Sequence, residues 1–194
     1  MSTRPKTTCF VTLCASLALA AGGCGGIVDE KAEARFRAAI GNTSITVFPA
    51  FIRDGQEHRY EAGAAKTIGD FLTRENLATA TVSDAEVPIT SKWGMNQAKM
   101  FRGSAADFSA YVGEHPIGTD YALLPEYLIS GGRAVGGVHL YLVDAEGTVA
   151  YGALLNSHWK EFNDVNPKTT DDCTTIVINK LRLDLARSVD TPAE

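Results

Sequence analysis

The stretch that decides the fold runs from Thr119 to Asn156 and reads TDYALLPEYLISGGRAVGGVHLYLVDAEGTVAYGALLN. It is the densest apolar segment beyond the N-terminal leader, and it predicts three strands joined by two turns. The second turn is placed at Gly147, since glycine can take the positive φ that a tight hairpin needs. Alternation with the two-residue period of a β-strand assigns the side chains to faces. The prediction places Val138, Leu140 and Leu142 on one face, His139, Tyr141 and Val143 on the other, and Val149, Tyr151, Ala153 and Leu155 together on one face of the return strand.

The rest of the chain alternates between helical and extended patterns. Apolar residues at helical spacing predict helices over residues 31–40, 62–76, 96–112 and 171–187. Strands are predicted over 44–52 and within 77–89, and the second of these is polar enough to lie near a sheet edge. Residues 53–59 are expected to form a polar turn and residues 157–170 a long loop.

The predicted order is a short helix followed by β-α-β-α-β-β-β-α. Alternating strands and helices need crossover connections, so the first strands are expected to pair in parallel, whereas the late hairpin must pair antiparallel. The prediction is therefore an α/β fold with a mixed parallel and antiparallel sheet and helices packed on it. The expected divisions are a signal peptide over 1–23, a tether with a short helix over 24–43, a single domain over 44–188 and a tail over 189–194.

Composition and charge limit the classes of function. The 194 residues suffice for one domain, and 45% hydrophobic and 21% charged residues are ordinary for a folded protein. The net charge is −5, and the leader carries Arg4 and Lys6, so the remainder sits near −7. An acidic domain without a basic cluster is a poor nucleic-acid binder, because phosphate contacts need clustered Lys and Arg.

The N-terminal residues predict where the protein resides. Two basic residues near the start precede an apolar run from Cys9 to Ala21, which has the length of a signal-peptide core and is too short to span a bilayer. Small residues then stand immediately before Cys24. This pattern resembles a bacterial lipobox, although Ala21 occupies the position where leucine is preferred. The alternative is a plain secretory peptide, cut after Ala20 or Ala21, that leaves Cys24 as a free thiol.

The lipobox resemblance implies a diacylglyceryl group on the Cys24 thiol and acyl chains such as palmitate. Several acyl chains anchor a protein stably where one chain is marginal. Gly25 follows Cys24, where aspartate would be the usual signal for retention in the inner membrane. The resemblance therefore favours the outer membrane, with the domain facing the periplasm.

Cysteine and histidine usage predicts neither a metal site nor a cofactor. Cys9 and Cys14 leave with the leader and Cys24 takes lipid, so Cys173 alone remains for a disulfide or a zinc site. Cys173 stands near the start of the last predicted helix but on its apolar stripe, which predicts a buried and inert thiol. No two of the four histidines are three or four residues apart, so no helical metal pair is expected.

Four segments carry a resemblance to a group of bacterial envelope lipoproteins. They are ITVFPAFI (45–52), GAAKTIGDFL (63–72), GTDYALLPEYLI (118–129) and VHLYLVDAEGTVAYGA (138–153). The group includes curli-secretion, penicillin-binding-protein-activator and transport-auxiliary lipoproteins, which share a fold with the N-terminal domain of the Tol–Pal translocation protein. The resemblance covers residues 44–187 and implies protein binding in the periplasm without any catalytic residue. The Trp-containing loop over 157–170 departs from the group.

The first functional hypothesis is a non-enzymatic, lipid-anchored protein that binds another envelope protein. Its candidate interaction surface is His158, Trp159 and Phe162, because aromatic residues are enriched at interface hot spots. The alternative for Trp159 and Phe162 is that they fold back and cover the sheet.

Two other functions compete with this one. A small periplasmic enzyme could use His139 or His158 with a nearby carboxylate such as Asp144 or Asp164. A histidine on a half-buried strand face, however, is more often a surface residue or a satisfied core residue. The remaining hypothesis is a structural subunit that oligomerises through a sheet edge.

Overall fold

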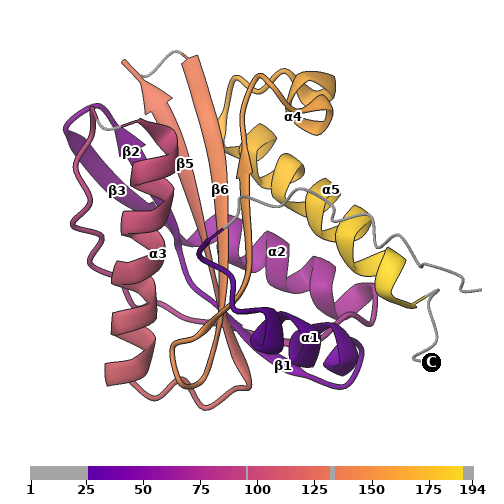
Figure 1. The fold of residues 1–194 in the computed structure, drawn as a ribbon. Coiled ribbons are helices and arrows are strands. Elements are labelled where there is room, and N and C mark those ends of the chain that lie inside the picture. The colour runs from indigo at the N-terminus through magenta and orange to yellow at the C-terminus, as the bar shows by residue number, and fades with distance from the viewer. Residues whose placement is uncertain (1–25, 95, 132–133, 190–194) are drawn as a thin grey trace, which may run out of the picture.

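A computed structural model describes residues 26–94, 96–131 and 134–189 (Figure 1). The predicted signal peptide, Cys24 and the last five residues lie outside the described residues. The described part has a mixed α/β fold, as the sequence predicts. Its elements are α1 (Glu30–Ala39), β1 (Ser44–Val47), β2 (Ala50–Asp54), β3 (Glu57–Glu61), α2 (Ala62–Arg74), β4 (Thr79–Val82), α3 (Gln97–Glu114), β5 (Tyr121–Ser130), β6 (Ala134–Asp144), β7 (Val149–Leu155), α4 (Lys160–Val165) and α5 (Thr170–Val189).

The seven-stranded sheet is built around β5. On one side of β5, β1 and β2 follow one another, and both pair with β5 in parallel. On the other side, β6 pairs with β5 antiparallel and β7 pairs antiparallel with β6. β4 lies outside β1 in parallel, and β3 lies outside β2 antiparallel. The predicted mixture of parallel crossovers and a late antiparallel hairpin is confirmed, and the polar strand β4 does lie at an edge.

The prediction of one strand over 44–52 followed by a polar turn over 53–59 is wrong, because this segment forms the three strands β1, β2 and β3. Pro49 separates β1 from β2, because proline lacks the N–H that a continuous ladder needs. The chain then remains extended to Asp54, turns at Gly55 and returns as β3. The residues of β3 are exposed or half-buried, so its sequence EHRYE lacks the apolar alternation that identifies a strand.

Helices cover both faces of the sheet (Figure 1). α1, α2 and α5 pack against one face, where they form the larger core with side chains such as Phe36, Ile68 and Leu181. α3 packs against the opposite face, where Phe101 and Phe108 meet residues from the central strands. The four predicted helices form because each has an apolar stripe that packs on the sheet. Asn96 also caps α3 by accepting a hydrogen bond from the backbone N–H of Lys99. None of the described helices has the length and apolarity to cross a membrane.

The hairpin of β6 and β7 follows the predicted faces except at one residue. Val138, Leu140 and Leu142 lie in the core under α2 and α5, whereas Tyr141 and Val143 lie in the core under α3. The prediction that Val149 shares a face with Tyr151, Ala153 and Leu155 is wrong. The pairing register of β6 and β7 shifts between Leu142 and Val143, and this β-bulge sends Val149 to the α3 side.

The segment over 157–170 is a second correction, because it contains α4 and is not a loop throughout. Phe162 is the buried residue of this helix and joins the larger core. The helix has only six residues and ends at Asn166 in the left-handed conformation. Two apolar residues, Phe162 and Val165, are too few in so short a segment to show a helical period, so the sequence predicts a loop.

Candidate functional site

A cluster of polar side chains lies buried between the sheet and α3. Its members are Arg53 on β2, Ser104 on α3, Glu126 on β5, and His139 and Tyr141 on β6. Arg53 is 6% exposed, and the other four are completely buried. Buried charges are costly unless they are paired and hydrogen-bonded, so the arrangement of these five residues needs a specific account. We call them the Glu126 cluster.

Glu126 is the centre of the cluster and accepts hydrogen bonds on both carboxylate oxygens. Oε1 accepts from Arg53 Nη2 at 2.9 Å and Nε at 3.2 Å, and from the Ser104 hydroxyl at 3.2 Å. Oε2 accepts from the Tyr141 hydroxyl at 2.7 Å and lies 2.9 Å from His139 Nδ1. A charge-assisted network of this kind ties three strands and one helix together at a single carboxylate.

The strand register brings these residues together. Glu126 on β5 pairs directly with His139 on β6, and Tyr141 follows two residues later on the same face of the sheet. Arg53 reaches Glu126 from β2, on the other side of β5. Sequence reasoning missed Glu126 and Arg53, although a single carboxylate inside the apolar strand YALLPEYLIS indicates that a cation must lie opposite it.

The electrostatics of the cluster keep the carboxyl ionised and the phenol neutral. Burial alone would raise the pKa of Glu126, but the contacts with His139 and Arg53 and the hydrogen bond from Tyr141 hold that pKa below its usual 4.5. Burial and the neighbouring Glu126 raise the pKa of Tyr141 well above 10.0. Tyr141 therefore stays protonated and donates to Glu126.

Only one of the two ring nitrogens of His139 has a hydrogen-bond partner among the described residues. A carboxylate can only accept hydrogen bonds, so the contact with Glu126 puts a proton on Nδ1. Nε2 is buried without a hydrogen-bond partner. The imidazole ring instead lies edge to face with Phe101, at 5.3 Å between ring centroids, and Phe101 stacks on Tyr141 at 5.0 Å. α3 thus closes the cluster with an aromatic cover.

The outer end of the cluster reaches a polar hollow. Arg53 donates to the carbonyl oxygen of Ser91 and to its hydroxyl, and both residues line a hollow of about 180 Å³. His58, Lys92 and Trp93 line the same hollow. The groups that could move protons, Glu126, His139 and Tyr141, lie deeper and are bonded to one another. The hydrogen bonds and ion pairs of the cluster therefore stabilise the sheet by joining β2, β5 and β6 to α3.

The predicted pairing of His139 with Asp144 is wrong, because His139 contacts Glu126 instead. The Asp144 carboxylate accepts from Arg35 at 2.9 Å and from the backbone of Thr148. Asp164 is likewise not a histidine partner, since it pairs with Lys160 on the exposed side of α4. Neither carboxylate named for the enzyme hypothesis is brought to a histidine.

The predicted interaction surface is divided by the fold. His158 is exposed, Trp159 is half-buried, and Phe162 is 6% exposed and packs in the larger core. Phe162 is therefore a core residue and not part of an exposed interaction surface, as the alternative interpretation expects, because α4 turns Phe162 inward. Trp159 packs beside the same core, with Lys180 Nζ 5.5 Å from the centre of its ring.

Cys173 is buried on the apolar stripe of α5, as the sequence predicts. Burial, with a contribution from the nearby Asp172, raises the pKa of its thiol to about 12, so the thiolate that would act as a nucleophile does not form near neutral pH. Within the described residues, no group of three or more His, Cys, Asp or Glu side chains could hold a metal ion.

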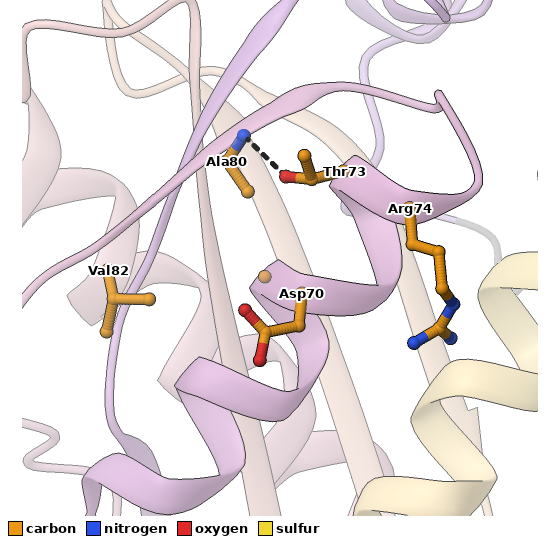
Figure 2. A pocket seen from close by; sticks show the side chains of 6 residues that line it. Asp70, Thr73, Arg74, Ala80 and Val82 are labelled. Carbon is orange, nitrogen blue, oxygen red and sulfur yellow. Dashed lines mark hydrogen bonds between the residues drawn. The ribbon is translucent and has the colours of Figure 1, made fainter.

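A second surface feature is an open groove between α2 and the edge strand β4. Figure 2 shows five of its side chains, Asp70, Thr73 and Arg74 from α2 and Ala80 and Val82 from β4. Gly69 forms part of the same lining. The groove measures about 520 Å³, and Val82 is 49% exposed beside it.

Acidification should remove the stability that Glu126 contributes. Its pKa in the folded chain lies below 4.5, so this contribution is complete above the unfolded pKa near 4.5 and is lost as the pH falls through the folded pKa. Urea unfolding followed from about pH 7 to about pH 3 should show the gap between wild type and Glu126→Gln shrinking with acidification. A gap that stays constant over this range would contradict the lowered pKa.

Comparison with solved structures gives a weak likeness. No family model matches the chain, and no curated protein matches its sequence. Among solved structures, the NMR structure of E. coli LpoB is similar over 80% of this chain and 82% of that chain, with 12% sequence identity and a TM-score of 0.32. A TM-score of this size does not establish a shared fold, and it assigns no role to any residue.

Proposed function

We propose that the chain is a lipid-anchored protein of the bacterial cell envelope that acts without catalysis, by binding another envelope protein. The observation that carries the proposal is the N-terminal pattern of two basic residues, the apolar run from Cys9 to Ala21, and small residues immediately before Cys24. Lipid on Cys24 would hold the domain at the outer membrane, facing the periplasm.

The geometry of the Glu126 cluster supports a non-enzymatic role. Glu126, His139 and Tyr141 have the chemistry of acid–base catalysts, but all three are fully buried and hydrogen-bonded to one another. A general base must reach the proton that it removes, and α3 lies over this cluster. Among the described residues, the surfaces open to other molecules include the exposed region around His158, the hollow beside Arg53 and the groove beside β4.

Replacing Cys24 by serine should move the protein from the membrane fraction to the soluble fraction. The serine side chain has no thiol to receive the diacylglyceryl group, so the acyl chains that hold the protein at the bilayer would be missing. Cell fractionation, combined with mass spectrometry of the N-terminal peptide, measures this. The matched control is Cys14→Ser, which alters the apolar leader alone and should leave the protein in membranes. A Cys24→Ser protein that stays in membranes would contradict lipid anchoring.

A photo-reactive side chain at position 158 should form an adduct of one reproducible mass with another envelope protein. His158 is exposed beside Trp159. The matched position is His115, an exposed histidine that directly follows the C-terminal end of α3. The experiment uses intact cells that carry the full chain, with gel electrophoresis and mass spectrometry as the readout. Adducts of the same masses at both positions, or none at 158, would rule out this region as the binding surface.

A further inference from the structure

We propose that β4 pairs with β4 of a second copy of this chain, in an antiparallel and two-fold symmetric register with Thr81 opposite Thr81 of the second copy. The pairing would join the two sheets edge to edge. This inference does not depend on lipid at Cys24 or on the identity of any envelope partner. It rests on the backbone and the side chains of the edge strand β4.

The backbone of β4 has one edge available for pairing. The Thr79 N–H donates to the carbonyl oxygen of Thr43, just before β1, at 2.9 Å. The Ser83 N–H donates to the carbonyl oxygen of Val47 at the end of β1, also at 2.9 Å. Backbone groups alternate in direction along a strand, so those of Ala80 and Val82 point away from β1. Within the part of the chain that the structure describes, the Ala80 N–H donates to the Thr73 hydroxyl at a long 3.4 Å (Figure 2). An edge of this kind is a template for another strand.

The sequence of the edge is complementary to itself when it is reversed. With Thr81 on the two-fold axis, Ala80 of one copy lies opposite Val82 of the other, and Thr79 lies opposite Ser83. Ala80 and Val82 are on the α2 face of the sheet, since a Cβ placed on Gly69 would lie 3.6 Å and 3.4 Å from their side chains. A small residue thus faces a large one on this face. On the other face threonine meets threonine, a favourable cross-strand pair.

The charged residues beside the edge are paired within one copy. Asp70 accepts a hydrogen bond from Lys66 at 2.7 Å, and Arg74 lies 3.8 Å from the Glu75 carboxylate. The two-fold pairing of β4 therefore rests on the strand itself, and it uses one surface patch twice, as isologous dimers do.

The edge strand β4 is short, with four residues, but it carries no charged residue or proline that would oppose this pairing. Natural edge strands carry charged residues, prolines or bulges that prevent association. No charged residue and no proline stands between Glu75 and Asp84. Val82 and Leu183 are the large apolar side chains that the described residues leave exposed, at 49% and 42%. Burial of Val82 against a second copy explains why such a residue lies on an otherwise polar strand.

Cysteine at position 81 tests the register. In the proposed pairing Thr81 and its counterpart form a non-hydrogen-bonded pair with Cα atoms about 4.5 Å apart, close enough for a disulfide. The full chain carrying Thr81→Cys should form a covalent homodimer under mild oxidation, visible on a non-reducing gel. The matched control is Thr175→Cys on α5, an exposed threonine away from β4 that should remain monomeric. Cys173 is buried and does not compete.

Lysine at position 82 tests the surface itself. Val82→Lys should abolish both the Thr81→Cys cross-link and the dimer mass of the detergent-solubilised full chain in light scattering. Leu183→Lys changes the other exposed apolar residue and should leave both unchanged. Far-UV circular dichroism shows that each variant is folded. A wild-type chain that is monomeric at every concentration, with Thr81→Cys cross-linking no faster than Thr175→Cys, would overturn the proposal. A cross-link from position 81 to a protein of different mass would also overturn it, in favour of a strand from another protein.

Discussion

Replacing Glu126 by alanine should lower the free energy of unfolding by about 3–5 kcal/mol, the cost of leaving a buried charge without its partner. Arg53 would keep its positive charge at 6% exposure, and the hydroxyls of Ser104 and Tyr141 would lose their shared acceptor. Urea unfolding followed by the fluorescence of the two tryptophans measures the loss. Glu114→Ala, at an exposed position near the end of α3, is the matched control and should change stability by less than about 0.5 kcal/mol.

A double variant separates the burial of charge from the loss of packing. Arg53→Met combined with Glu126→Leu removes both charges and keeps comparable volume, so the pair should be more stable than Glu126→Ala alone. His139 and Tyr141 would still lack their acceptor, and recovery should therefore be partial. A double variant as unstable as the single one would show that an unpaired Arg53 is not the source of the cost.

The local parts of this fold were predictable because their signals are local. The alternation from Val138 to Val143 assigned both faces of β6 correctly, and the apolar stripe of α2 placed that helix within two residues. β3 was missed because its outward residues are polar, and its strand geometry comes from pairing with β2. Val149 was assigned to the wrong face because a bulge in the ladder leaves no trace in the alternation of side chains.

The candidate site was predictable only in part, since its contacts span large sequence separations. His139 was singled out by its position in an apolar strand, but its partner Glu126 is 13 residues away across the sheet, and Arg53 is another 73 residues from Glu126. Sequence proximity suggested Asp144 instead, which the fold pairs with Arg35 across 109 residues. The register of β2, β5 and β6 decides which carboxylate meets which cation, and no local pattern encodes that register.

Gly147 should be the second position with a large effect, because Gly147→Ala introduces two separate costs. The residue has a φ of +81°, where an L-residue with a Cβ is strained. That Cβ would also lie 2.5 Å from the carbonyl oxygen of Ser109 and 3.2 Å from the backbone nitrogen of Gly113, both on α3. Left-handed strain and a forced backbone shift together should lower the free energy of unfolding by about 2–4 kcal/mol.

Gly55→Ala separates these two costs. Gly55 also has a positive φ, +63°, in the turn between β2 and β3, but a Cβ there would meet nothing within 4 Å. This variant should therefore lose only the conformational part, about 1 kcal/mol. The difference between the two variants in urea unfolding measures how firmly the β6–β7 turn is packed against α3. Equal losses would mean that the turn moves away from α3 without cost. In that case strand pairing alone would hold the hairpin. The close approach of Gly147 to Ser109 would then not stabilise the packing of α3 over the Glu126 cluster.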